Sequence, residues 1–171
     1  MTFRSIKRAV GAVLFAAAPF AAVPFVAVLG ASAPALAQDA SLEPVFGSVT
    51  LKAGFTPDPR SVDIVAGGTE DASHLGDACV GMVGDAPDYR LNYTAGGLPL
   101  NLWVYADVDT TLVVNDPSGE WVCNDDGAGD GGNVNPGLRW ANPPSGVYDI
   151  WVGRYSSGDG AKARLVFTET H

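Results

Sequence analysis

An acidic, glycine-rich stretch after Cys123 holds the side chains best suited to bind a metal ion. It covers residues 124–136, a length that is usual for functional or disordered loops. Calcium takes about six to eight oxygen ligands, and the glycines leave backbone carbonyls free to supply some of them. We therefore expect one calcium ion here, and the alternative is a solvated loop whose Asp side chains cap turns. The expected side-chain ligands are Asn124, Asp125, Asp126 and Asp130.

Histidine, serine and cysteine are not arranged for nucleophilic catalysis. A serine hydrolase needs a histidine as general base, and the chain offers only His74 and His171. His171 is the last residue of the sequence, and His74 stands in a stretch without strand periodicity. The two cysteines do not form a Cys-x-x-Cys zinc motif. The sequence thus predicts no enzyme and no catalytic residue.

Aromatic side chains on the expected strands offer a second kind of binding surface. Trp103 and Tyr105 alternate with aliphatic neighbours, so they occupy the opposite face of their strand. Trp121 and Trp151 are further candidates for ligand contact. Exposed aromatic rings stack on sugars, which would suit a polysaccharide ligand. The alternative is that these rings pack in the core or pair across strands.

The N-terminus has the order of a secretory signal peptide. The first eight residues contain three cations and no acid, an apolar run covers residues 9–29, and an Ala-Leu-Ala triplet ends just before Gln38. This order predicts cleavage that removes residues 1–37 and delivers the protein to the periplasm or the medium. The alternative is a membrane anchor, because the run is long enough to span a bilayer, although two prolines interrupt it.

The charge of the chain excludes several classes of partner. Three of its 10 Lys and Arg residues lie in the expected signal peptide, which leaves seven cations against 19 Asp and Glu, a net charge of −12. Binding to nucleic acid or to an anionic membrane needs clustered Lys and Arg. We therefore expect no nucleic-acid partner and, after cleavage, no membrane contact. A protein or a polysaccharide partner stays open.

Cys79 and Cys123 are the two cysteines of the chain, and both follow the expected signal peptide. An isolated cysteine pair in an oxidising compartment usually forms a disulfide. The sequence therefore predicts a bond between Cys79 and Cys123.

The chain after the signal reads as short β segments separated by glycine- and proline-rich turns, of which residues 116–119 are one. Apolar and polar residues alternate with a period of two, and β-branched and aromatic residues are frequent. These features predict a flexible N-terminal lead at 38–44, then an all-β domain at 45–171 built as a sandwich of two antiparallel sheets. The expected strands are 45–51, 61–66, 89–94, 100–105, 110–114, 120–123, 137–141, 147–152 and 163–168.

Residues 109–126 resemble the core of the bacterial pre-peptidase C-terminal domain. They read Asp-Thr-Thr-Leu-Val-Val-Asn-Asp-Pro-Ser-Gly-Glu-Trp-Val-Cys-Asn-Asp-Asp, and residues 135–137 and 144–153 continue the resemblance. It implies a jelly-roll-like sandwich that usually serves as a non-catalytic appendage of secreted peptidases. Some members bind calcium, which would fall here to Asp125 and Asp126. Small relatives carry a peptidase label by association, but no catalytic domain is attached in this chain.

The sequence therefore predicts an exported, non-catalytic accessory or binding module that calcium stabilises. Two alternatives remain. One is an enzyme related to serine peptidases, which would need a serine in contact with a histidine. The other is a carbohydrate-binding module, which would need Trp103, Trp121 or Trp151 to face solvent.

Overall fold

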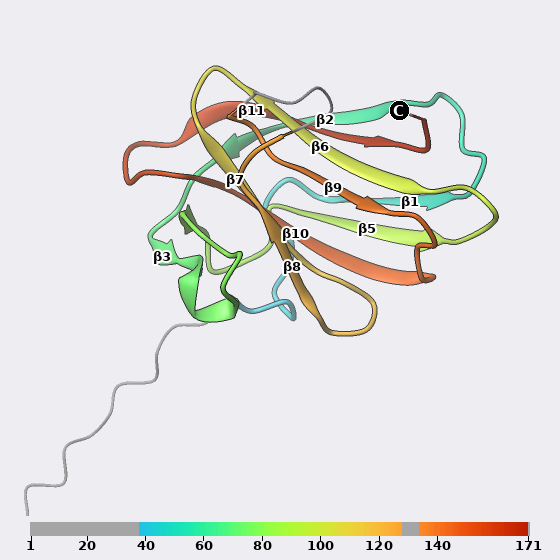
Figure 1. The fold of residues 1–171 in the computed structure, drawn as a ribbon, viewed down its shortest axis with the longest axis horizontal. Coiled ribbons are helices and arrows are strands. Elements are labelled where there is room, and N and C mark those ends of the chain that lie inside the picture. The colour runs from blue at the N-terminus through green and yellow to red at the C-terminus, as the bar shows by residue number, and fades with distance from the viewer. Residues whose placement is uncertain (1–37, 128–133, 171) are drawn as a thin grey trace, which may run out of the picture. The chain divides into compact units, whose positions relative to one another are not determined.

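The computed structural model describes residues 38–127 and 134–170, which form two β-sheets (Figure 1). The expected signal peptide lies outside this part of the chain. The four-stranded sheet contains β2 (Arg60–Ala66), β6 (Leu100–Ala106), β9 (Gly137–Trp140) and β11 (Ala161–Thr168). The seven-stranded sheet contains β1 (Ser48–Lys52), β3 (Glu70–Asp71), β4 (Met82–Val83), β5 (Tyr89–Thr94), β7 (Thr110–Asn115), β8 (Trp121–Asn124) and β10 (Gly146–Arg154). A single 3-10 turn, η1 (Ala72–Leu75), follows β3, and no helix of the described residues is long and apolar enough to cross a bilayer.

The main hydrophobic core lies between the two sheets. Leu91 and Ile150 come from the seven-stranded sheet, Leu102 and Leu165 come from the four-stranded sheet, and all four are fully buried. Successive side chains of a strand point to opposite faces, so these positions fix which residues face outward. The prediction of an all-β sandwich of two sheets is confirmed.

Strand pairing is antiparallel with one exception. In the four-stranded sheet the order is β2-β11-β6-β9, and in the other sheet β10 pairs with β4, β5 and β7. β1, however, runs parallel to β5, with Ser48 opposite Arg90. The chain leaves β1 for β2 in the other sheet before it returns to β5, so no hairpin forces the two strands to be antiparallel. The expectation of purely antiparallel sheets is corrected at this edge.

A second cluster of buried side chains covers the part of the outer face of the seven-stranded sheet that β7 and β10 form. Val113 of β7 and Trp151 of β10 are fully buried there against Ala72, Cys79 and Val83. The segment from η1 to β4 therefore acts as a cover for this face. Residues 148–153 of β10 are therefore buried on both faces of the sheet.

The segment 38–44, expected to be a flexible lead, makes specific contacts with the domain. The Asp39 N–H donates to the Asp85 carbonyl at 3.0 Å. Arg90 donates from Nη2 to the carbonyls of Ala40 and Leu42 at 2.7 and 3.0 Å, and its Nε pairs with Asp149 at 2.5 Å. These bonds hold the segment against the end of the seven-stranded sheet.

Candidate functional site

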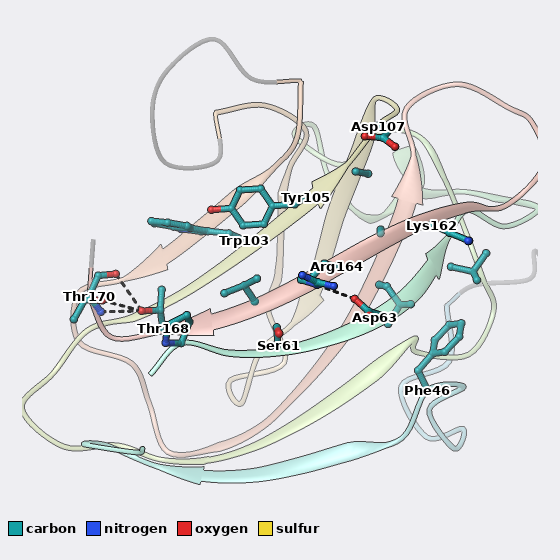
Figure 2. Close-up of a pocket in the computed structure, with 16 residues that line it drawn as sticks. Phe46, Ser61, Asp63, Trp103, Tyr105, Asp107, Lys162, Arg164, Thr168 and Thr170 are labelled. Atoms are coloured by element: carbon teal, nitrogen blue, oxygen red, sulfur yellow. Dashed lines mark hydrogen bonds and ion pairs between the residues drawn. The ribbon is translucent and has the colours of Figure 1, made fainter. Parts of the chain in front are cut away.

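The outer face of the four-stranded sheet carries an open hollow of about 1110 Å³ (Figure 2). Its floor consists of outward positions on three neighbouring strands, β2, β11 and β6. Because Ile64, Leu165 and Val104 point into the core, the residues that alternate with them point outward. The side chains that matter for binding are Asp63, Trp103, Tyr105, Lys162 and Arg164.

Trp103 and Tyr105 lie next to each other on the outward face of β6 (Figure 2). The Tyr105 side chain is 42% exposed, whereas Trp103 is half-buried. Across the strand pair, Trp103 stands opposite Gly137 of β9. A glycine offers no side chain, so the β9 residue directly opposite Trp103 adds no side chain to this face. The expectation that these two rings share one outward face agrees with the structure.

An ion pair crosses the hollow beside the aromatic rings. Arg164 of β11 stands between Asp63 of β2 and Tyr105 of β6 in the register of the sheet. Its Nε donates to Asp63 Oδ1 at 2.7 Å, while the two side chains remain 58% and 75% exposed. This bond lowers the pKa of the Asp63 carboxyl and raises the pKa of Arg164. A charged donor and a charged acceptor are thus held together within reach of solvent.

The hollow is electrically neutral although the protein is strongly acidic. Among the described residues, the charged side chains that line it are two acids, Asp63 and Asp107, and two cations, Lys162 and Arg164. The whole chain, in contrast, has a formal net charge of −9. Most of the acidic side chains therefore lie away from this face, so their repulsion of an electron-rich ligand is weaker there.

One end of the hollow is stiffened by a buried asparagine. Asn101 of β6 is fully buried, and its Nδ2 donates to the carbonyls of Thr168 and Thr170 at 3.1 and 3.2 Å. Arg139 of β9 donates to Asn101 Oδ1 at 3.1 Å. Thr168 and Thr170 also hydrogen-bond to each other at the rim (Figure 2). These bonds fasten the segment after β11 to the strand that carries Trp103.

Trp151 does not belong to a ligand surface, which corrects the sequence-based expectation. It is fully buried, its ring centroid lies 5.2 Å from that of Trp121, and its Nε1 donates to the Asp85 carbonyl at 3.3 Å. Trp121 is half-buried and packs against the same cluster. Trp151 fails as a ligand contact because β10 is a central strand with both faces covered.

The predicted disulfide is present and ties this second cluster together. Cys79 and Cys123 are bonded, with their Cα atoms 5.0 Å apart. The bond joins the segment after η1 to β8, which the turn at residues 116–119 connects to β7. The Asp116 N–H donates to the Glu120 carbonyl at 3.0 Å and closes that turn.

The acidic loop is only partly within the described residues, and Asp130 lies outside them. Asn124 Oδ1 accepts a hydrogen bond from the Gly137 N–H at 3.1 Å, so this side chain helps to close the base of the loop. Asp125 and Asp126 are present near Asp109 at the start of β7. Burial and the two nearby carboxylates raise the pKa of Asp109. Among the described residues, no three acidic, His or Cys side chains are grouped as metal ligands.

The sequence analysis did not identify Asp109 as a neighbour of this loop. It lies 16 residues before Asp125 in the chain. Only the β7–β8 pairing, which places Leu112 opposite Asn124, brings the two regions together. The signal that could have identified it is its position in the sequence. Asp109 directly precedes β7, and β7 forms a hairpin with β8, the strand that leads into the loop.

His74 is engaged in local structure. Its Nδ1 contacts the Asp71 carbonyl at 2.7 Å, and Asp71 accepts a hydrogen bond from the Ser73 N–H at the start of η1. The ring is exposed on this short turn. His171 lies outside the described residues.

Asp88 is a buried carboxylic acid that lies beside β10, directly before β5. Its Oδ2 accepts a hydrogen bond from the Val152 N–H at 2.6 Å, and its own N–H donates to the Ile150 carbonyl at 2.8 Å. Residue 88 thus extends the pairing of β5 with β10 by one side-chain bond. Burial raises the pKa of Asp88 to about 7, and the bond from Val152 partly opposes this effect.

The raised pKa makes stability depend on pH. The folded protein holds the Asp88 proton up to about pH 7, whereas an unfolded chain loses it near the ordinary value of 3.8. Between these values the folded state binds more protons, so this group makes the protein less stable as pH rises, by at most about 1.4 kcal/mol per pH unit. The free energy of unfolding, measured in denaturant at several pH values, should therefore fall more steeply with rising pH in the wild type than in Asp88→Asn over this window. The exposed Asp77→Asn variant serves as control, and equal slopes for wild type and Asp88→Asn would contradict the assignment.

Comparisons with known proteins identify no family for this chain. No family model matches the chain, and no curated protein matches it. A solved structure that matches is PliG of Aeromonas hydrophila, a periplasmic lysozyme inhibitor of g-type lysozyme. It is 15% identical with a TM-score of 0.38, over 71% of this chain and 96% of that one. A likeness at this level carries no conclusion about this chain, and the resemblance to the pre-peptidase C-terminal domain stays a prediction.

Proposed function

We propose that this protein is an exported, non-catalytic binding module that holds its ligand on the outer face of the four-stranded sheet. The observation that supports this most is the open hollow in which Trp103 and Tyr105 lie beside the Asp63–Arg164 pair. Concave sites lined by aromatic side chains and a few fixed polar groups are the usual form of ligand pockets. On the opposite outer face, the part formed by β7 and β10 around Trp151 is buried under its own cover.

Export is supported by two independent features. The N-terminal residues have the order of a signal peptide. The disulfide between Cys79 and Cys123 is of a kind that persists in oxidising compartments. A binding role also agrees with the resemblance to the pre-peptidase C-terminal domain, whose members are appendages of secreted enzymes.

The location of the binding surface can be tested before the ligand is known. Wild type, Trp103→Ala and Tyr155→Ala are compared for retention on a panel of polysaccharides and for capture of proteins from the exported fraction. Tyr155 is 49% exposed and does not line the hollow, so it is a matched control. Whatever the wild type retains should be lost in Trp103→Ala and kept in Tyr155→Ala. A ligand held equally by all three proteins would place the binding surface elsewhere.

We further propose that calcium binds beside the acidic loop. Burial raises the pKa of Asp109, and the carboxylates of Asp126 and Asp125 add to this rise, so repulsion acts between this loop and the start of β7. A divalent cation would relieve this repulsion, and all-oxygen ligands favour calcium. Asn124 takes part through the base of the loop, where its amide fastens Gly137.

Added calcium should stabilise the folded protein. A ligand that binds only the folded state adds about 2.7 kcal/mol at 100 times its dissociation constant. Thermal melting is followed in EDTA and in saturating calcium for wild type and for Asp125→Asn/Asp126→Asn. We expect a higher melting temperature with calcium in the wild type alone. No shift, or the same shift in the double variant, would leave the loop as a solvated turn.

A further inference from the structure

The chemistry of the hollow indicates which class of ligand it takes. Trp103 and Tyr105 are two residues apart on one strand, so their Cα atoms lie about 7 Å apart along β6. Both rings belong to the same outward face. A ligand that uses both must present apolar patches at a repeating interval along its length. Sugar rings in a chain do so through their C–H faces.

The polar groups beside the rings suit hydroxyl pairs. The Asp63 carboxylate is an acceptor and the Arg164 guanidinium is a planar donor. Their 2.7 Å bond holds them side by side while both remain more than half exposed. Two adjacent hydroxyls of a sugar can donate to the one and accept from the other. Ser61, also exposed on this face, adds a hydroxyl of its own.

The charge of the hollow argues for an uncharged ligand. The lining acids and cations cancel, so neither a polyanion nor a polycation gains net attraction there. A polyanion would in addition be repelled by the exported protein, whose seven cations against 19 acids give a net charge of −12.

A protein partner fits this face less well. The fully buried centre of a protein–protein interface is depleted of charged residues. Here the exposed Asp63–Arg164 pair joins the edge strand β2 to the middle strand β11, next to Tyr105. Docking a protein would remove both charges from water, whereas hydroxyl groups of a sugar replace the water that they lose.

We infer that the outer face of the four-stranded sheet binds an uncharged polysaccharide chain, whose sugar rings stack on Trp103 and Tyr105 and whose hydroxyls bond to Asp63 and Arg164. This inference rests on the proposed function and names its ligand class. Loss of one ring removes stacking worth about tenfold in affinity. Because the ligand carries no charge, the affinity does not change with ionic strength.

The test measures retention of the exported protein on uncharged cellulose, chitin, curdlan and mannan, and on charged alginate and chitosan. The expected result is binding to at least one uncharged polymer that is unchanged over a roughly tenfold range of ionic strength. Trp103→Ala and Tyr105→Ala should each weaken that binding about tenfold, and Tyr155→Ala should not. Thermal melting checks that each variant is folded, and Trp103→Phe should restore most of the binding.

The other outcomes overturn different statements. Retention only on alginate or chitosan, with strong dependence on salt, would contradict the uncharged ligand. Capture of a defined protein that depends on Trp103, with no retention on any polysaccharide, would overturn the ligand class and leave the binding face intact. Polysaccharide binding that is equal in wild type, Trp103→Ala and Tyr105→Ala would overturn the face itself.

Discussion

Removal of the disulfide by Cys79→Ala/Cys123→Ala is expected to lower the free energy of unfolding by about 4 kcal/mol. The bond restricts the unfolded chain, and a closed loop of this length reduces the entropy of the unfolded state by about that amount. The two cysteines are 44 residues apart in sequence. The loop that they close contains β4, β5, β6 and β7. Cys79 also packs in the cluster that covers Trp151. Unfolding in urea, followed by tryptophan fluorescence, measures the change.

Reduction of the wild type provides the control for this prediction. It breaks the cross-link but keeps both sulfur atoms in place, so it separates the effect of the bond from that of side-chain packing. The reduced wild type should lose most of the same stability as the double variant. A loss below about 1 kcal/mol in both would contradict a stabilising role.

Trp151→Ala is expected to lower the free energy of unfolding by about 3–5 kcal/mol, the usual cost of removing a large aromatic side chain from a core. Trp151 is fully buried between Trp121 and the disulfide segment, and its indole N–H is bonded to the Asp85 carbonyl. The substitution leaves a cavity and removes one of the two hydrogen bonds that the Asp85 carbonyl accepts. Chemical denaturation of the purified variant gives the value.

The half-buried Trp121 serves as the comparison for Trp151. Trp121→Ala removes the outer ring of the same pair, so its effect on stability should be smaller. Ligand binding should survive in both variants under conditions where they are folded. If a folded Trp151→Ala variant had lost ligand binding, this would contradict the statement that Trp151 lies outside the ligand surface.

Much of the strand pattern could be predicted from sequence because alternation is a local property. Strands such as β2, β6 and β11 were expected within a residue or two of their observed bounds. The two-residue strands β3 and β4 were not expected, since they are too short to show a period. The parallel pairing of β1 with β5 depends on which strand returns to which sheet, and no local pattern records that.

The candidate site was only partly predictable for the same reason. Alternation correctly placed Trp103 and Tyr105 on one face. It misplaced Trp151, because a period of two shows that a residue faces away from the core but not whether another segment covers it. Asp63 and Arg164 are 101 residues apart, and only the pairing of β2 with β11 brings them together.

The central claim is that the outer face of the four-stranded sheet holds the ligand, and the four tryptophans of the chain allow a direct test. Trp103 lies in the hollow, Trp121 and Trp151 lie in the covered cluster, and Trp140 packs on Tyr148. The measurement is a titration of ¹⁵N-labelled protein with cellohexaose, chitohexaose, laminarihexaose and mannohexaose, followed through the four indole N–H signals. The account predicts that at least one sugar shifts the Trp103 signal and leaves Trp151 unchanged. A shift at Trp121 or Trp151 with Trp103 unmoved, or no shift with any of the four, would contradict it.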